Sequence, residues 1–306
     1  MGRFLAFRIL GLIPTMFVIV TLSFFVIRLA PGSPFDEERT VSPEVKADLE
    51  AKYGFDRPLP MQYLIYLGNL LRFDLGLSTK YPQRSVNEII GLGFPVTLSL
   101  AAVAFVWSLL LGITAGTVGA IRQNTIWDYS AMSTAMIGIS LPTFVLGPLL
   151  VLMFSLTFFI FPPAGWGTWR HIILPGLTLG TFYAAYIARL TRGGMLEVVR
   201  SDFVRTARAK GLAEHVIVWR HMFKGGLLPV VTFIGPAVAH MMVGSVVVEQ
   251  VFDTPGIGPY FVVAALNRDY FLVMGIVVLE SVFLLLMNLF VDLAYGFLDP
   301  RIRFGP

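Results

Sequence analysis

The sequence predicts an all-α, polytopic membrane protein with six transmembrane helices. Of its 306 residues, 56% are hydrophobic and only 14% are charged, whereas an ordinary soluble domain has about 25% charged residues. Several stretches of about twenty residues lack acidic and basic side chains, which is the length that crosses a bilayer. This composition excludes a disordered chain, a nucleic-acid-binding arm and an ordinary water-soluble enzyme. Because cysteine is absent, disulfide scaffolds, thiolate metal sites and cysteine nucleophiles are excluded too.

Six apolar stretches predict the membrane helices in order along the chain. They are residues 9–27, about 95–121, about 131–160, 172–188, 227–248 and 271–291. The fourth is short and contains Pro175-Gly176, so a count of five stays open. Prolines within the stretches are compatible with helices, because neighbouring helices satisfy the freed backbone groups. A cleaved signal peptide is the alternative for the first stretch, but its apolar run exceeds that of a usual signal and no small-residue cleavage site follows. This favours an uncleaved helix.

The distribution of basic residues predicts that both termini lie in the cytoplasm. Thirteen Lys and Arg residues fall on one side of the six-helix arrangement, whereas the short loops of the other side hold only Arg170 and Arg268. Short cytoplasmic loops carry the basic excess in membrane proteins. The expected organisation is residues 1–30 as the first membrane helix, 31–94 as an extracytoplasmic loop with short helices, and 95–306 as the core with the other five helices.

The long outer loop contains two predicted helices. Ser42-Pro43-Glu44 is typical of a helix start, and Gly54 suits the left-handed residue that follows a helix end. Residues 61–72 are amphipathic and predict a second helix. The loop is expected either to cover the outer ends of the membrane helices or to form a docking surface or gate.

The segment 191–224 is the most informative part of the chain, because it is basic, interleaved with apolar residues and divided by Gly211. Gly211 can adopt a left-handed turn between a helix around 200–210 and a second helix at about 213–224. The first of these helices has an apolar face with Val199, Phe203 and Ala207, and a basic face with Arg205 and Arg208. A positively charged anchor on the inner leaflet would explain the charge. It would not explain the row of small residues before Gly211, which permits another protein's backbone to approach closely.

Ionisable residues interrupt the last two apolar stretches, His240 in the fifth and Glu280 in the sixth. Such groups usually face the bundle interior and pair. We expect them to pair with each other, to bind the charged end of a substrate, or to contact a second membrane subunit. Near the inner end of the sixth helix, Asp292 predicts an interfacial ion pair with Arg301 or Arg303.

Several of these segments together resemble a known family. Arg205-Thr206-Ala207-Arg208-Ala209-Lys210-Gly211-Leu212, followed by His221 and Leu227-Leu228-Pro229, resembles the cytoplasmic "EAA" loop of ABC importer membrane subunits, in the version of the oligopeptide/dipeptide permeases. Further resemblances extend over essentially the whole chain: Leu29-Ala30-Pro31-Gly32-Ser33-Pro34, Asp56-Arg57-Pro58-Leu59-Pro60, Asp74-Leu75-Gly76-Leu77-Ser78, Pro255-Gly256-Ile257-Gly258, Arg268-Asp269-Tyr270 and Asp299-Pro300-Arg301-Ile302-Arg303. The long first outer loop resembles that of the B-type subunit.

The chain departs from the family pattern at three places. The general loop has Glu, Ala and Ala at the positions of Arg205, Thr206 and Ala207, and here only the last is kept. Gly225-Gly226 stands where the branch often has Asn-Ala, and Glu280 matches no feature of the family.

The resemblance implies a type I ABC importer permease fold and the transmembrane subunit of an ATP-driven importer of di- or oligopeptides in the cytoplasmic membrane. It implies that Arg205 to Leu212 couple to ATPases. It also places Glu249, Pro255, Gly256 and Gly258 near the extracellular gate, with a purely rigid loop as the alternative. The implied partners are a second homologous permease subunit of the C-type, two cytoplasmic ATPase subunits, an extracytoplasmic peptide-binding protein, membrane lipids and the peptide substrate, but no nucleic acid.

The chain itself is not expected to be an enzyme. It contains no Gly-x-x-x-x-Gly-Lys-Ser/Thr loop to hold ATP phosphates, so no catalytic residue, metal or cofactor is expected. An intramembrane peptidase is disfavoured because H-E-x-x-H and a pair of intramembrane Asp residues are absent. The alternatives are a permease for nickel, glutathione or sugars, or an ion-coupled carrier in which Glu280 and His240 relay protons. A carrier, like a structural scaffold, would leave the basic loop unexplained.

Overall fold

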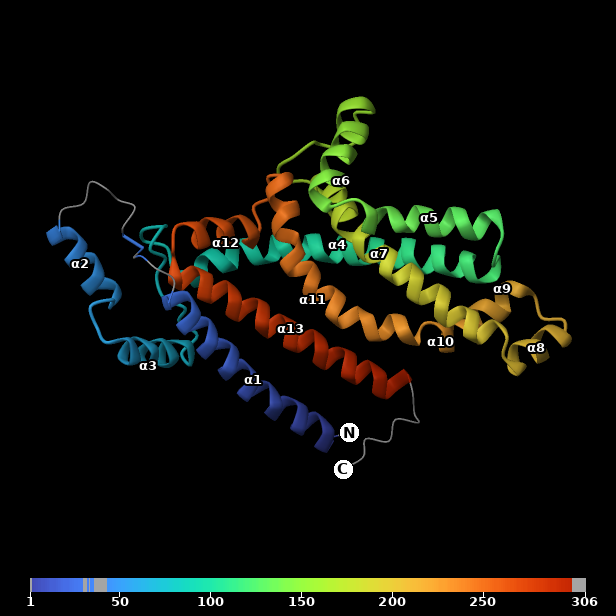
Figure 1. Ribbon diagram of the computed structural model, residues 1–306, viewed down its shortest axis with the longest axis horizontal. Helices are drawn as coiled ribbons and strands as arrows, with labels where there is room; N and C mark the ends of the chain where they lie inside the picture. The colour runs from blue at the N-terminus through green and yellow to red at the C-terminus, as the bar shows by residue number, and fades with distance from the viewer. Residues whose placement is uncertain (1, 30–31, 33, 36–42, 299–306) are drawn as a thin grey trace. The chain divides into compact units, whose positions relative to one another are not determined.

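The computed structural model describes residues 2–29, 32, 34–35 and 43–298, and the elements of that part of the chain are helices (Figure 1). Five of them are long and apolar enough to cross a membrane, and a bent pair makes a sixth span if taken together. The predicted all-α membrane class is confirmed, and the count of six includes the bent pair. The chain divides into two compact units, Met1–Val96 with Gly256–Phe283 (unit 1) and Thr97–Pro255 with Leu284–Pro306 (unit 2).

Unit 1 combines the first membrane helix with the short helices of the outer loop. Its elements are α1 (Gly2–Leu29), α2 (Pro43–Tyr53), α3 (Leu59–Leu70), the start of α4 (Val86–Ile121), α12 (Ile257–Leu266) and the start of α13 (Tyr270–Leu298). One apolar cluster joins Phe24 of α1 to Tyr66 of α3 and Met274 of α13. A second joins the start of α4 to α12 and α13. The outer-loop helices are therefore packed onto membrane helices of their own unit.

The two helices predicted for the outer loop are confirmed. α2 ends at Tyr53, and Gly54 follows with φ +72°, the left-handed conformation that glycine adopts at no steric cost. The predicted N-cap Ser42 lies outside the described residues. α3 begins at Leu59, directly after Pro58.

The loop expected between the last two membrane helices is partly helical, because α12 occupies most of it. Gly256 caps α12 with φ −84° and ψ −169°, so its backbone is extended rather than left-handed. The left-handed residue of this turn is Asp253, with φ 49°. Gly256 is the last residue of the turn, and Gly258 lies inside α12.

Unit 2 is built around one long helix, α7 (Trp169–Val199), which contacts α5, α6, α10 and α11 (Figure 1). Its other elements are the rest of α4, α5 (Ile126–Ser140), α6 (Thr143–Leu150), the π-helical η1 (Val151–Thr157), α8 (Asp202–Ala209), α9 (Glu214–Ile217), the π-helical η2 (Val218–Met222), α10 (Phe223–Gly226) and α11 (Leu228–Val251). Glycines permit close helix contacts here: a Cβ on Gly138 of α5 would lie 2.0 Å from the Thr181 oxygen of α7.

Three predicted helix boundaries are wrong. The helix expected at about 131–160 is broken, because Leu141, which precedes Pro142, has φ −108° and ψ 122°. A residue before proline is driven out of the helical region, and the two halves are bent by 113°. α7 continues past the predicted end at 188, since Arg189 and Arg192 are tolerated within it. α4 begins at Val86, inside the range expected to be loop.

Candidate functional site

The basic segment before α11 folds as a helical hairpin, residues 200–226, in which α8 is followed by a turn at Gly211 and then by α9, η2 and α10. Gly211 has φ +74°, so the predicted left-handed turn is confirmed. The helix expected around 200–210 is shorter, because α7 runs through Val199 and the chain turns before α8 starts at Asp202. The second predicted helix exists but is divided by the π-helical η2.

The inner face of α8 is buried against the rest of unit 2. Val204 and Ala207 are 0% and 4% exposed and belong to one cluster with Ile217, Met222 and Met195 of α7. The prediction that Phe203 shares the apolar face with Ala207 is wrong, since Phe203 is 50% exposed. The turn between α7 and α8 separates Val199 from the α8 residues. Within α8 the buried stripe runs through Val204 and Ala207, three residues apart, and leaves Phe203 at its exposed edge.

The small side chain of Ala207 therefore has a role different from the expected one. We expected it to allow a partner's backbone to approach. In the structure it lies against the hairpin's own second half, within the buried cluster. It lets α8 pack closely on α9 and η2, and it offers almost no surface to another protein.

The outer face of α8 is basic and open. The exposed residues of the predicted coupling segment are Arg205, Thr206, Arg208, Ala209, Lys210, Gly211 and Leu212. Arg208 pairs with Glu214 of α9, with 2.6 Å between Nη2 and Oε1. The hydrogen bond from Arg208 holds the pKa of Glu214 below its ordinary value. Trp219 of η2 is 72% exposed, so the hairpin presents aromatic as well as basic side chains.

The hairpin is anchored to α7 by a direct backbone contact. A Cβ on Gly194 of α7 would lie 2.2 Å from the carbonyl oxygen of Gly226 in α10, and a Cβ on Gly226 would lie 2.6 Å from Met195 Sδ. Gly194 therefore needs glycine, because the opposing atom is a backbone oxygen. At Gly226 the nearest atom belongs to the flexible Met195 side chain, which can move.

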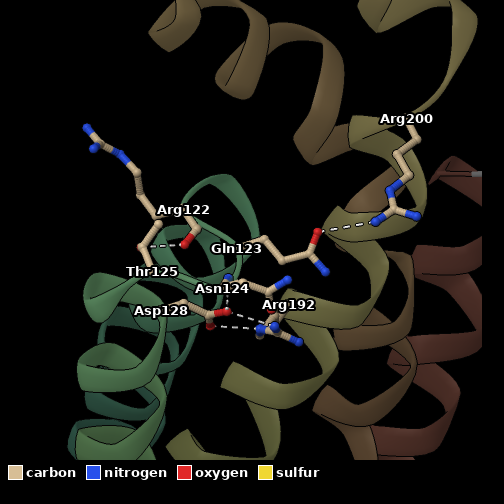
Figure 2. Close-up of polar contacts among 7 residues, drawn as sticks. All are labelled: Arg122, Gln123, Asn124, Thr125, Asp128, Arg192 and Arg200. Carbon is tan, nitrogen blue, oxygen red and sulfur yellow. Dashed lines mark hydrogen bonds and ion pairs between the residues drawn. The ribbon is translucent and has the colours of Figure 1, made fainter.

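A buried ion pair ties α7 to α5 just beyond the hairpin. Figure 2 shows Arg192 of α7 donating from Nε and Nη2 to the two carboxylate oxygens of Asp128, at 2.9 and 2.8 Å. The backbone N–H of Asn124 donates to the same carboxylate at 3.0 Å. Nearby, Arg200 donates to Gln123 Oε1 at 3.3 Å. The end of α7 is thus held to the turn between α4 and α5.

Sequence reasoning missed this pair. It counted Arg192 among the loop charges and did not single out Asp128. The only available signal was an acid in the first turn of an otherwise apolar helix, α5. Such an acid also suits the positive end of a helix dipole, so the sequence did not indicate its arginine partner.

The residues predicted for a gate differ in exposure. Glu249 of α11 is fully buried, and Thr97 Oγ1 donates to its Oε1 at 2.7 Å. Pro255 is exposed, whereas Gly256 and Gly258 are buried. This buried, hydrogen-bonded carboxylate holds the carboxyl end of α11 to α4 within unit 2.

His240 lies on an exposed part of α11. Its Nδ1 is 2.7 Å from the Pro236 carbonyl oxygen; since a carbonyl only accepts, Nδ1 carries the proton. His240 also lines a cavity of about 200 Å³ with Phe182, Tyr186 and Phe233. Glu280 is half-buried in α13 of unit 1. A pairing of His240 with Glu280 stays a prediction, and Arg301 and Arg303, the expected partners of Asp292, lie outside the described residues.

Within the described part of the chain, no group of three or more His, Asp or Glu residues is placed to hold a metal ion. The polar contacts of the site join Arg208 to Glu214 within the hairpin, α7 to α5 and α4 to α11. This arrangement can transmit a displacement from the hairpin to membrane helices.

Comparison with known proteins shows which family this architecture belongs to. Residues 108–304 match the family described as "Binding-protein-dependent transport system inner membrane component", and residues 1–101 match its N-terminal counterpart. The chain is 47% identical over 306 residues to the oligopeptide transport system permease protein OppB of Haemophilus influenzae, covering 99% of this chain and 100% of the relative. It is 44% identical over 303 residues to the dipeptide transport system permease protein DppB of Bacillus subtilis, covering 99% and 98%.

The fold also resembles a solved transporter. An inward-facing structure of the MetNI methionine ABC transporter matches with a TM-score of 0.56 at 16% identity, covering 69% of this chain and 96% of that one. At this identity the match concerns the fold alone. With the family matches covering nearly the whole sequence and with five or six apolar spans, the chain belongs to the binding-protein-dependent transport system inner membrane components, as a multi-pass permease subunit.

Proposed function

We propose that this permease subunit serves an ATP-driven importer that carries peptides across the cytoplasmic membrane. The observation that carries the cargo assignment is the near-full-length identity to an oligopeptide permease and a dipeptide permease. The glutathione alternative has a weaker match of the same kind, because the chain is 39% identical over 303 residues to the glutathione transport system permease protein GsiC of Pectobacterium atrosepticum. The nickel, sugar and ion-coupled alternatives have no such observation. The ATP is hydrolysed by partner subunits, because the chain has no phosphate-binding loop of its own.

The basic hairpin is the proposed docking element for the ATPases. Its outer face combines the arginine and lysine side chains of Arg205 and Lys210 with the exposed ring of Phe203. Arginine and aromatic residues are enriched at protein interfaces, where they bury area and form charge-assisted hydrogen bonds. Acidic residues at the rim of a groove on the ATPase would pair with the two basic side chains.

The internal contacts of unit 2 support a rigid transmission of movement. The hairpin is fixed to α7 through the buried cluster of Val204 and Met195 and through the contact of Gly194 with Gly226. The Arg192–Asp128 pair continues the connection to α5. ATP-driven movement of the ATPases would therefore displace α7 and α5 together. This displacement would switch the substrate pathway between access from inside the cell and access from outside.

The proposed assembly contains two permease subunits, two ATPases and an extracytoplasmic peptide-binding protein. Two-fold symmetry of the ATPases requires two docking elements, and this chain offers one hairpin, so a related C-type permease would supply the second. We also propose that both termini and the hairpin lie in the cytoplasm, from the basic excess on that side. The gate role of Glu249 and the loop at Pro255 remains part of this proposal.

The docking proposal is tested with Arg205→Glu and Phe203→Ala in the assembled transporter. Both side chains are exposed, so the fold should persist while ATPase binding and peptide uptake fall by about tenfold or more. Arg84→Glu, the same charge change at an exposed position of the outer loop, is the control. Ala207→Arg is unsuitable because it would disrupt the buried cluster. Wild-type uptake by both hairpin variants would refute the docking site.

The cargo is tested separately by uptake assays with purified components and peptides of increasing length. Peptide-dependent uptake that requires ATP and survives an ionophore is expected. Uptake of nickel or glutathione without peptide competition would refute the peptide assignment. If the ionophore abolishes uptake even though ATP is present, an ion-coupled carrier is supported instead.

A further inference from the structure

Unit 1 contains a cavity of about 250 Å³ whose chemistry the transport role does not use. It lies among the carboxyl end of α1, the end of α2 and the face of α3. Arg28, Lys52 and Arg57 contribute three positive charges to its lining, and no Asp or Glu is among the described residues that line it. The charge of this described part of the lining suits an anionic group.

The guanidinium of Arg28 lies among aromatic rings. Its Cζ lies 4.4 Å from the ring centroid of Phe55 and 4.7 Å from that of Tyr270. Contact with aromatic rings stabilises a guanidinium, and its N–H edge can still donate to an anion. Among the ion pairs formed by the described residues, none involves Arg28. A half-buried arginine without a carboxylate is stabilised when an oxyanion binds to that edge.

Two buried polar atoms of the same cavity lining also lack partners. Tyr66 is only 5% exposed, and its hydroxyl has no hydrogen bond within the described structure; the same holds for Gln62 Oε1. Buried polar groups are normally satisfied, so both atoms point to a missing ligand. Burial raises the pKa of the Tyr66 phenol, which keeps it a neutral donor. The site thus combines donors for an oxyanion with one acceptor for a hydroxyl.

The surroundings favour a lipid as the source of the anion. Arg28 is the penultimate residue of the candidate membrane span Arg8–Leu29, where phospholipid headgroups lie. Val26 and Leu29 on α1 are 65% and 78% exposed, and Leu64 on α3 is 62% exposed. The helices that form the cavity therefore also offer apolar surface for acyl chains.

We propose that this cavity binds the phosphate of a phospholipid headgroup that also carries a hydroxyl, as phosphatidylglycerol does. The phosphate accepts hydrogen bonds from Arg28 and Tyr66, Lys52 and Arg57 add positive charge, and the headgroup hydroxyl donates to Gln62. The bound lipid would hold α1, α2 and α3 together at the membrane surface.

The test uses the assembled transporter, purified in detergent, depleted of lipid and then titrated with phosphatidylglycerol, with bound lipid counted by native mass spectrometry. Arg28→Gln should weaken lipid retention by about tenfold or more, as expected for a charge-assisted hydrogen bond. Tyr66→Phe removes only the unpartnered hydroxyl, keeps the ring in its apolar cluster and should weaken retention several-fold. Arg72→Gln, an exposed arginine just after α3, should retain lipid as the wild type does.

Each alternative outcome is distinguishable from the expected one. Equal retention by the wild type, Arg28→Gln and Tyr66→Phe would overturn the proposal. Inorganic phosphate that raises the melting temperature in an Arg28-dependent way, with no phosphatidylglycerol retained, would assign a free-anion site and overturn the lipid. Loss of binding-protein affinity in Arg28→Gln with unchanged lipid retention would overturn it in favour of a protein contact. Because lipid retention is read without transport, its failure would leave the peptide-import proposal untouched.

Discussion

The contact between Gly194 of α7 and Gly226 of α10 provides a sharp test of how the basic hairpin is held. Gly193 and Gly194 are adjacent on α7, yet their surroundings differ. A Cβ added to Gly194 would lie 2.2 Å from the Gly226 oxygen, whereas a Cβ on Gly193 meets no atom within 4 Å. The substitutions Gly193→Ala and Gly194→Ala thus share the same chemistry and helix, and differ in packing.

The expected effects have opposite signs. Replacing glycine by alanine within a helix stabilises by about 0.5–1 kcal/mol, and Gly193→Ala should show that gain. In Gly194→Ala the new methyl group meets a backbone oxygen that cannot rotate away, so α7 and α10 must separate by about 1 Å to reach normal contact. Overpacking of this kind costs about 1–3 kcal/mol, which offsets the helix gain and leaves a net destabilisation.

The measurement is the apparent melting temperature of the assembled transporter in detergent, together with ATP hydrolysis and peptide uptake. Gly193→Ala should melt at or above the wild-type temperature and transport normally. Gly194→Ala should melt lower and lose uptake relative to ATP hydrolysis, because the hairpin moves away from α7. If the two variants melt and transport alike, the close approach of α7 and α10 is not what holds the hairpin.

Three further predictions concern the other buried contacts of unit 2. Asp128→Asn and Arg192→Gln should each destabilise by about 1.5–3 kcal/mol, as expected for hydrogen bonds between charged groups. The double variant should cost less than the two losses added, as a double-mutant cycle of melting temperatures would reveal; additive losses would contradict a direct pair. Thr97→Val removes the hydrogen bond to buried Glu249 and should lower the stability of the protein by about 1–3 kcal/mol, whereas Thr97→Ser should melt close to the wild-type temperature. Equal melting temperatures of the two variants would argue against a stabilising role of this hydrogen bond. Gly138→Ala should lower the melting temperature and the yield of assembled transporter, since its Cβ would lie 2.0 Å from a backbone oxygen of α7; a wild-type yield and melting temperature would contradict the tight α5–α7 contact.

The amino-acid sequence alone determined the membrane class, the approximate spans and the position of the basic hairpin. These features depend on local properties: the apolar length needed to cross a bilayer and the steric freedom of single glycines. Gly54 and Gly211 were both expected to be left-handed, and both have positive φ. α2 ends where the glycine signal placed it. Such predictions succeed because the deciding interactions lie within a few residues.

The tertiary structure decided which side chains meet. Packing of α8 on the rest of unit 2 put Val204 and Ala207 on its buried face and left Phe203 exposed. The pairing of Asp128 with Arg192 joins residues far apart in the sequence, so no local pattern contains it. Ala207 faces its own chain because packing, and not periodicity, decides what a helical face contacts. Periodicity fixes only which residues share that face.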